Sequence, residues 1–291
     1  MGAAVATCLV ECGHQVGWLR KGRSGATLQR AKQAGLTAFD DLGHLLANTD
    51  IVFSICPPHR ALGVAQQLAG FRGIVVDANA ISPMTSTLIG RTIAHGGARY
   101  VDGGIIGPPP LTAGTTRIYL AGDDGKVAGV FAGSALEAIG LAGAPPAASA
   151  LKMMYAAWTK TTAALLVSIR HTATAFGVDD DLAAEWAISQ PLLPAAWQRA
   201  QQQSVEKGWR WCYELEEVGR TFAAAGEPEG FGAAASQVFA ASLTKTHAQA
   251  IHTLRQGTRT ENRILRQIEP RPPADAFRKW RCASTCADRS R

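Results

Sequence analysis

The stretch "VDGGIIGPPPLTAGTTRIYLAG" at residues 101–122, followed by "ASALKMMYAAWTK" at residues 148–160, decides the fold of this chain. The first part predicts a strand over 98–110 that ends in a loop rich in glycine and proline, and a further strand over 115–122. The second part opens a long segment, 147–176, that contains no breaker and repeats apolar residues at helical spacing. The pattern therefore changes from strands to helices near residue 146.

Upstream of this stretch, short apolar strands alternate with helices. The strand candidates lie at 14–20, 50–58 and 73–83, and residues 24–35 predict a helix. Strands that alternate with helices of this length are typical of a parallel, doubly wound sheet. We therefore expect an α/β domain over residues 1–146.

Downstream of this stretch, the pattern predicts only helices. Beyond the first long helix, helical segments lie at about 181–203, 205–225 and 230–256. We expect an all-α domain over residues 147–258. The remaining residues, 259–291, predict a basic, disordered tail.

Charge and cysteine content exclude several classes of function. From residue 253 onward, ten basic and four acidic side chains account for the whole net charge of +6. No aromatic residue lies between Arg255 and Arg266, which favours a solvated face over nucleic-acid binding. None of the six cysteines forms a CxxC pair, which argues against a metal site or a redox dithiol. No apolar run approaches 18 residues and no signal peptide is seen, so we expect a cytoplasmic protein without a membrane partner.

The order of these motifs resembles the β-hydroxyacid dehydrogenase superfamily, which includes 3-hydroxyisobutyrate and 6-phosphogluconate dehydrogenases. The segments "VDANAISPMT" at 76–85 and "KGWRWCYELEEVGRTFAAAGEPEGF" at 207–231 look like one branch of it. That branch comprises NAD(P)-dependent oxidoreductases with a variant phosphogluconate-dehydrogenase-like C-terminal domain. The resemblance covers about residues 1–245, and it implies a Rossmann-like sheet, a nicotinamide cofactor, a small-molecule substrate and a homodimer.

The beginning of the sequence departs from this pattern. In the superfamily the first strand runs into a GxGxMG turn, of which Met1 and Gly2 match only the last two positions. These glycines let the backbone approach the cofactor pyrophosphate at a helix N-terminus, so Gly2 is a candidate cofactor contact. We expect a truncated chain or a misplaced start codon, with the first strand of the sheet missing. The alternative is a pseudoenzyme that no longer binds nucleotide.

The end of the first predicted strand indicates the choice of cofactor. NAD-binding proteins place an acidic residue there for the ribose hydroxyl, whereas this chain has Arg20, Arg23 and Ser24. The two arginines are suited to the 2′-phosphate of NADP, and Ser24 is also the predicted N-cap of the next helix. We expect NADP as the cofactor, with NAD as the alternative. These residues could also form only a basic surface turn that does not bind a cofactor.

Two further strand ends are predicted to lie at the same edge of the sheet. Cys56 and Pro57 end one strand, and Asn79 follows the next. Ligands bind at the carboxyl edge of open α/β sheets, and the resemblance implies that these loops flank the cofactor. The alternative is that the proline only stops a strand and that Asn79 only caps a turn.

Lys152 is the strongest chemical candidate. The resemblance implies that a lysine on this helix is the general acid/base, because a hydroxyl must lose its proton when the hydride leaves its carbon. The alternative is a surface lysine whose stem lies beside Leu151. Lys160 follows eight residues later, which places it about 80° around an α-helix from Lys152, and it is the second candidate for the same cleft.

Other positions depart from the substrate-binding pattern of the superfamily. Tyr155 replaces an asparagine that orients substrate, and Ile106-Gly107-Pro108 replaces a Ser-Gly-Gly loop that binds a carboxylate. Asp102 is expected to order this loop. A bulkier or less acidic alcohol, ketone or imine therefore fits at least as well as a short hydroxy acid.

The sequence thus predicts an NADP-dependent oxidoreductase that moves a hydride between nicotinamide and a hydroxyl-bearing or carbonyl carbon. One alternative is an imine reductase-like activity. The other is a catalytically silent, truncated homologue that acts through a partner.

Overall fold

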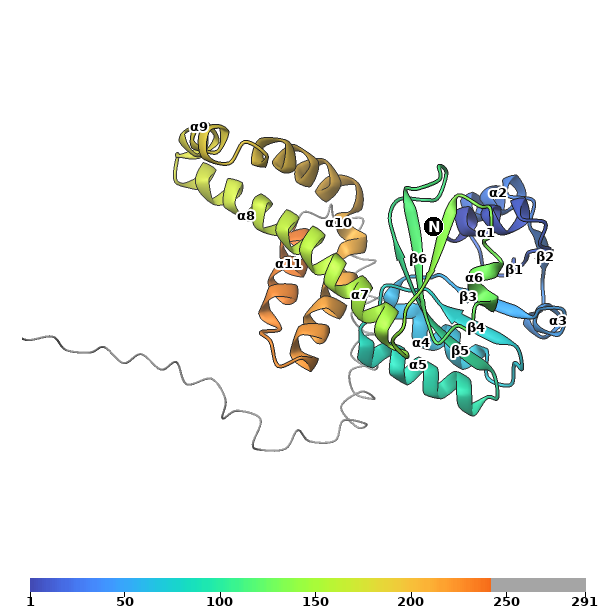
Figure 1. Cartoon of the computed structure of the whole chain (residues 1–291). Helices are drawn as coiled ribbons and strands as arrows, with labels where there is room; N and C mark the ends of the chain where they lie inside the picture. The colour runs from blue at the N-terminus through green and yellow to red at the C-terminus, as the bar shows by residue number, and fades with distance from the viewer. Residues whose placement is uncertain (242–291) are drawn as a thin grey trace, which may run out of the picture. The chain divides into compact units, whose positions relative to one another are not determined.

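The computed structural model describes residues 1–241. Its larger sheet has five strands in the order β3-β4-β5-β6-β7 (Figure 1). These strands are β3 (Ile51–Ser54), β4 (Ile74–Asp77), β5 (Arg99–Ile106), β6 (Thr116–Ala121) and β7 (Leu136–Gly140). Neighbours are parallel except β5 and β6, which run antiparallel. A separate parallel pair consists of β1 (Gly17–Leu19) and β2 (Thr37–Phe39).

Helices bury both faces of the larger sheet. The sheet part contains α1 (Gly2–Glu11), α2 (Gly25–Gln33), α3 (Leu42–Ala47), the 3₁₀ turn η1 (Pro58–Arg60), α4 (Ala61–Gln67), α5 (Pro83–His95) and α6 (Lys126–Gly129). One buried cluster joins Val5 of α1 and Val127 of α6 to Val76 of β4. A second joins α4 and α5 to Val75, the preceding residue of the same strand. Consecutive strand residues point to opposite faces, so the sheet has the helix-covered, doubly wound arrangement that the sequence predicts.

Side-chain caps determine where several of these helices begin. The hydroxyl of Ser24 accepts a hydrogen bond from the backbone N–H of Thr27 at the start of α2. Ser82 and Asp41 make the equivalent contacts at α5 and α3. Each cap satisfies a backbone donor that the first helical turn leaves without a partner, and the predicted cap at Ser24 is confirmed.

The helical part follows the sheet part in sequence, as expected from the change of pattern near residue 146. It consists of α7 (Ala147–Ala156), the π turn η2 (Ala157–Thr161), α8 (Thr162–Ala175), α9 (Asp179–Ser189), α10 (Leu193–Ala224) and α11 (Gly230–Ala241). The segments α7, η2 and α8 form one continuous helix (Figure 1). Helices α10 and α11 approach closely, because a Cβ at Gly232 would lie 2.4 Å from the backbone nitrogen of Gly219.

The predicted helix boundaries after residue 177 are wrong. The sequence predicts helices over 181–203 and 205–225, whereas α9 ends at Ser189 and α10 runs unbroken to Ala224. Pro194 explains this difference, because proline is excluded from a helix interior but fits the first turn, where it lies in α10. The predicted helix over 230–256 is described only as far as Ala241, and the domain end at 258 and the tail lie outside the described residues.

The strands also differ in part from prediction. Strands β3 and β4 are shorter than the predicted 50–58 and 73–83, because each gives way to a loop at the edge of the sheet. The short strands β2 and β7 escaped prediction. The sheet is mixed, since β6 returns antiparallel to β5.

The strand pairing does not test the expectation that the first strand of the sheet is missing, which stays a prediction. In the described part of the chain, no strand pairs with both β1 and β3, and the two sheets stay separate. Within the same residues, no helix is long and apolar enough to span a membrane.

Candidate functional site

A π turn lies in the middle of the long helix that carries both candidate lysines. In an α-helix the eight residues from Lys152 to Lys160 would leave these side chains about 80° apart. A π turn is in effect a one-residue insertion into an α-helix, so the remaining seven steps turn through about 700°, within about 20° of two full turns. The turn at Ala157–Thr161 therefore brings Lys160 onto the face that Lys152 occupies.

Both lysines point at one carboxylate on α10. The amino nitrogen of Lys152 lies 3.5 Å from Oε1 of Glu214, and Lys160 makes a shorter ion pair with the same oxygen. The side chain of Lys152 is 16% exposed, that of Lys160 is 12% exposed and that of Glu214 is 13% exposed. No third group in residues 1–241 donates a hydrogen bond to Oε1. The three side chains therefore form a nearly enclosed cluster of charges, which we call the lysine cluster.

The electrostatics of the lysine cluster combine burial with charge pairing. Burial holds the pKa of Lys160 below its ordinary value, against the opposing effect of Glu214 and with a smaller contribution from Lys152. Burial raises the pKa of Glu214, but the two ammonium groups outweigh it and bring the pKa below its ordinary value. Glu214 is therefore ionised at neutral pH, while Lys160 releases its proton more readily than a surface lysine. The amino group of Lys160 also lies 5.9 Å from the ring centre of Trp211.

The start of the lysine-bearing helix is anchored to the sheet by Asp102. This fully buried carboxylate accepts hydrogen bonds from the backbone N–H of Ser149 at 2.9 Å and from the hydroxyls of Ser149 and Ser86. Gly104 on the same strand lets the helix approach, since a Cβ there would lie 3.1 Å from Cβ of Lys152. Asp102 was predicted to order the substrate loop, and the structure places it where it fixes the helix that carries Lys152.

The ends of β3 and β4 are tied together by Asn79. Its side chain accepts a hydrogen bond from the N–H of Cys56 at 2.5 Å and donates one to the hydroxyl of Ser54 at 2.9 Å. Asn79 is 2% exposed, so it shapes this edge of the sheet by cross-linking two loops. Cys56 and Pro57 lie in the loop that it holds, and burial raises the pKa of the Cys56 thiol to about 11.

Asp77 is a second buried carboxylate at this edge, in register with Asp102 on the neighbouring strand. It accepts a hydrogen bond from the N–H of Asn79 at 3.0 Å. Burial raises the pKa of Asp77 to about 7, and the negative charge of Asp102 contributes to the shift. Asp77 therefore exchanges its proton near neutral pH.

The basic residues predicted to bind the 2′-phosphate differ in what they contact. Arg20 forms an exposed two-point ion pair with Asp40, just beyond β2. Arg23 donates a hydrogen bond to the carbonyl of Leu19 at 3.4 Å and, with Arg60, offsets part of the rise in the pKa of Cys56. Arg23 and Arg60 thus place positive charge at the end of β3, whereas the charge of Arg20 is offset by a carboxylate.

The other predicted residues lie near the same elements. Gly2 begins α1, with the backbone of Ile55 at the end of β3 beside it. Gly107 follows β5 with a φ of 126°, in the left-handed region that glycine tolerates. Tyr155 is 45% exposed on α7. The cofactor role of Gly2 and the substrate roles of Gly107 and Tyr155 stay predictions.

Two acidic residues of α10 were missed by sequence reasoning. Glu214 is the partner of both lysines, and Glu217 accepts hydrogen bonds from the backbone N–H of Ser82 at 2.7 Å and from the hydroxyl of Thr85 at 3.0 Å. Glu217 therefore joins α10 to the start of α5, and it also pairs with Arg220. The signal was present in the sequence "CYELEEVG", because Glu214 and Glu217 each lie next to apolar residues of a buried helical stripe.

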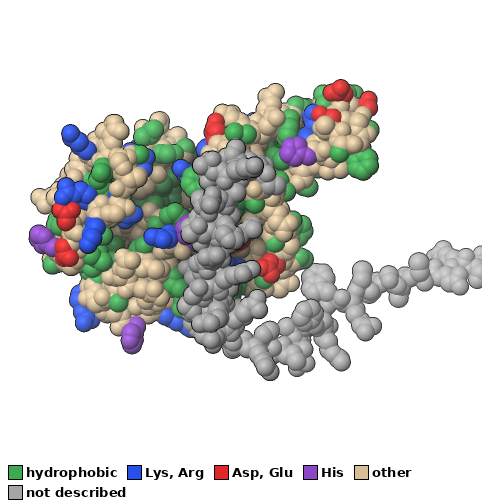
Figure 2. All heavy atoms as spheres, turned by 180° about the vertical axis from the view of Figure 1, so that it is seen from behind, with side chains coloured by type: hydrophobic (Ala, Val, Ile, Leu, Met, Phe, Trp, Pro, Cys, Tyr) green, Lys and Arg blue, Asp and Glu red, His purple; other side chains and the backbone are tan. Residues whose placement is uncertain are grey.

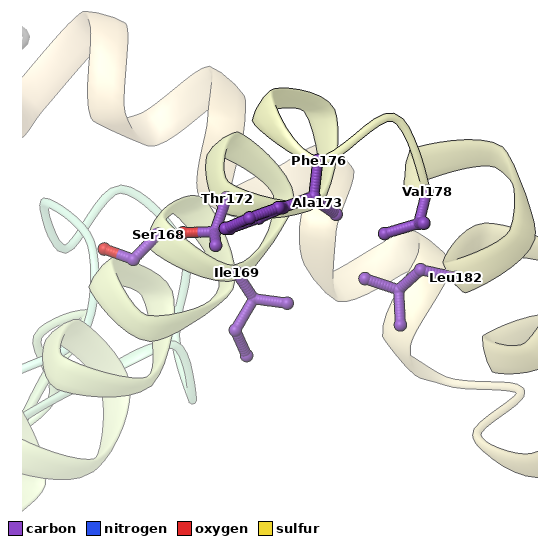
Figure 3. Close-up of a pocket in the computed structure, with 7 residues that line it drawn as sticks. All are labelled: Ser168, Ile169, Thr172, Ala173, Phe176, Val178 and Leu182. Atoms are coloured by element: carbon purple, nitrogen blue, oxygen red, sulfur yellow. The ribbon is translucent and has the colours of Figure 1, made fainter.

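Two apolar hollows lie along α8, away from these charges. One, of about 440 Å³, is bordered by the side chains that Figure 3 shows. Its lining residues are Ser168, Ile169, Thr172, Ala173, Phe176, Val178 and Leu182. The other, of about 430 Å³, lies between α8 and α11. Neither hollow is lined by a member of the lysine cluster, and residues 1–241 hold no group of three His, Cys, Asp or Glu side chains placed to bind a metal.

Comparison with solved structures places the architecture among known folds. The structure of a conserved protein of unknown function, described as similar to 3-hydroxyacid dehydrogenases, matches with a TM-score of 0.61 and 24% identity, covering 88% of this chain and 94% of that one. The Mycobacterium tuberculosis 3-hydroxyisobutyrate dehydrogenase matches with a TM-score of 0.63 and 20% identity, covering 88% and 96%. The chain has the fold of the 3-hydroxyacid dehydrogenases. The resemblance in architecture that the sequence predicts is confirmed.

Sequence comparison adds two relatives without an assigned role. Residues 173–242 match a family model described as a domain of unknown function, DUF1932. An uncharacterized 28.5 kDa protein of Methanothermus fervidus is 34% identical over 166 residues, which are 56% of this chain and 63% of that protein. The match thus spans less than two thirds of that relative. A further solved structure of the same fold, Psf3 in complex with NADP+ and 2-OPP, is 18% identical with a TM-score of 0.57, covering 82% of this chain and 89% of that one.

Proposed function

We propose that this chain is an NADP-dependent oxidoreductase that transfers a hydride between nicotinamide and a hydroxyl-bearing or carbonyl carbon, with Lys152 as the general acid/base. The observation that carries the proposal is the lysine cluster. Two amino groups meet at one buried carboxylate, on the helix that Asp102 and Gly104 hold against the sheet. Solved proteins with this fold include 3-hydroxyisobutyrate dehydrogenase and a protein bound to NADP+, which supports the class of reaction.

The residues at the carboxyl edge fit a phosphate-bearing dinucleotide. Arg23 and Arg60 supply positive charge beside Cys56, and Ser24 offers a hydroxyl at the N-terminus of α2. Asp40 already balances the charge of Arg20, so Arg23 is the stronger candidate for the 2′-phosphate. The choice of NADP over NAD rests on these side chains.

When bound, the nicotinamide ring supplies or accepts the hydride. The protein must supply the proton that accompanies it. In the direction of reduction, the ammonium of Lys152 donates a proton to the carbonyl oxygen as the hydride reaches the carbon; in oxidation, the neutral amine takes the hydroxyl proton. Burial in the lysine cluster keeps bulk water from competing for this proton.

We also propose that the chain acts as a homodimer. Large apolar side chains are exposed along α7, η2 and α8, and Trp158 is 73% exposed. The others on this helix are Leu151, Met154, Tyr155 and Leu165. Apolar side chains are also visible on the surface in Figure 2. An apolar surface of this kind is typical of a protein interface, and sedimentation would test it.

The proposed function is tested by measuring NADPH and NADH binding by fluorescence, and then NADPH oxidation with a panel of ketones, aldehydes, keto acids and imines. We expect NADPH binding and consumption with at least one carbonyl compound. Binding of neither nucleotide would contradict the proposal and favour the catalytically silent alternative. Consumption with imines alone would favour the imine reductase-like alternative.

A further inference from the structure

The lysine cluster contains more charged groups than one proton transfer requires. A single general acid/base needs one amine, yet Lys160 is buried beside Lys152 and shares Oε1 of Glu214 with it. Burying two ammonium groups carries a desolvation penalty for each ion, and one carboxylate offsets it only in part. With both lysines protonated and Glu214 ionised, the lysine cluster has a net charge of +1.

We propose that Glu214 and Lys160 form a proton relay that recharges Lys152 after it has given its proton to the substrate. The proposal rests on the proposed function of Lys152 and adds roles for two residues that act through it. Its basis is geometric, because both amino groups face the same oxygen and no third donor among residues 1–241 reaches it.

The relay conserves every proton. Reduction begins with both lysines protonated, and Lys152 loses its proton to the carbonyl oxygen. The lysine cluster is then neutral overall, with a neutral amine at Lys152, an ammonium at Lys160 and a carboxylate between them. The ammonium of Lys160 passes a proton to Oε1, and Oε1 passes it to the amine of Lys152. Lys160 is left neutral and regains its proton from solvent before the next turnover.

The direction of the relay follows from the roles of the two amines. Lys152 loses its proton to the substrate, and Lys160 makes the shorter ion pair with Glu214, which places Lys160 to pass its proton to Oε1. Burial lowers the pKa of Lys160, which favours this transfer. The π turn is necessary for this arrangement, because a regular α-helix would turn Lys160 about 80° away from Lys152.

Coupling between the amines is tested without any substrate, by following the side-chain ¹³Cε signals of the lysines during a pH titration. The variants are Lys152→Met, which replaces one amine by an uncharged side chain of similar size, and Glu214→Gln, which removes the negative charge. We expect the Lys160 midpoint to rise in Lys152→Met, because a like charge is lost while Glu214 remains, so that Lys160 binds its proton more tightly. Glu214→Gln should lower the Lys160 midpoint. An unchanged Lys160 midpoint in Lys152→Met would overturn the proposal.

The relay itself is tested by comparing the first turnover with later ones, in stopped-flow oxidation of NADPH by a carbonyl substrate found with the panel above. In Lys160→Met the first turnover should keep its rate, because Lys152 begins protonated. Later turnovers should slow at least tenfold, giving a burst of one NADPH per site. Added ammonium ions should restore part of the steady rate. Equal loss in the first and later turnovers, or no loss in either, would contradict the relay.

Lys207→Met is the matched control for both measurements, because Lys207 is an exposed lysine on α10. It should leave the Lys160 midpoint unchanged and should produce no burst. If no carbonyl compound is reduced, the proposed function fails. The titration needs no substrate, so it still shows whether the two amines are coupled. The two failures are therefore distinguishable. Lys160→Met also leaves Glu214 with a partner, so this variant should fold even if Glu214→Gln does not.

Discussion

The amino groups of Lys152 and Lys160 approach the same carboxylate oxygen, although eight residues separate them in sequence. A regular helix would leave them on different faces, and the π turn between them removes that offset. Glu214 therefore pairs with two amines at once, and the three side chains form one nearly enclosed cluster of charges.

We expect Lys152→Ala to lower turnover by about 10²–10⁴-fold, the usual contribution of general acid–base catalysis. Nucleotide affinity should barely change, because Lys152 serves the reacting carbon. The pH profile of turnover should lose one limb. Lys160→Ala should lower the steady rate less than Lys152→Ala; the reverse order would show that the general acid/base has been placed at the wrong lysine.

Arg23→Ala should weaken NADPH binding by about tenfold or more, which corresponds to the loss of one charged hydrogen bond of about 1.5–3 kcal/mol. NADH binding should change little, since NADH lacks the 2′-phosphate. Arg20→Ala is the internal comparison and should have the smaller effect, because Arg20 already pairs with Asp40. Titration calorimetry measures the affinities of the unaltered protein and of both variants for NADPH and NADH. Equal affinity of the unaltered protein for both nucleotides would refute the preference for NADP.

Asp77 should make the protein less stable as pH rises from about 4 to 7. The pKa of Asp77 is raised from 3.8 to about 7 in the folded state, so over this range the folded protein holds a proton that the unfolded chain has released. The free energy of unfolding should fall by up to about 4 kcal/mol across it, at 1.36 kcal/mol for each unit. Urea unfolding at pH 4 and pH 8, on either side of this range, measures the difference. Asp77→Asn should abolish most of this pH dependence, and an unchanged slope in this variant would rule out Asp77 as its source.

Glu217→Ala should destabilise the protein by about 3 kcal/mol, because it leaves the buried N–H of Ser82 and the hydroxyl of Thr85 without their acceptor. Glu217→Gln keeps an acceptor oxygen and should lose less. Glu227→Ala, at an exposed position, is the control and should stay within about 0.5 kcal/mol of the unaltered protein. Denaturant midpoints compare the three variants. A loss for Glu217→Ala no larger than the control would show that this contact does not hold α10 to α5.

Local chemistry accounts for the part of the structure that could be predicted from the sequence. The cap at Ser24, the alternation of strands and helices, and the change of pattern near residue 146 each depend on neighbouring residues alone. The partners of the charged residues depend on packing between distant elements. Asp40 follows a three-residue strand too short to predict. Glu214, the partner of Lys160, lies 54 residues further along the chain (214 − 160). Sequence periodicity also assumes a regular helix, so it could not reveal the π turn.

Deuterium transfer tests the central claim most directly. NADPH that carries deuterium on the reactive C4 position is incubated with the protein and the carbonyl panel, and the products are analysed by mass spectrometry. The proposed function predicts an alcohol with one deuterium on the hydroxyl-bearing carbon, formed by the unaltered protein and about 10²–10⁴-fold more slowly by Lys152→Ala. A protein that binds NADPH yet yields no deuterated alcohol or amine, or a Lys152→Ala variant as fast as the unaltered protein, would contradict it.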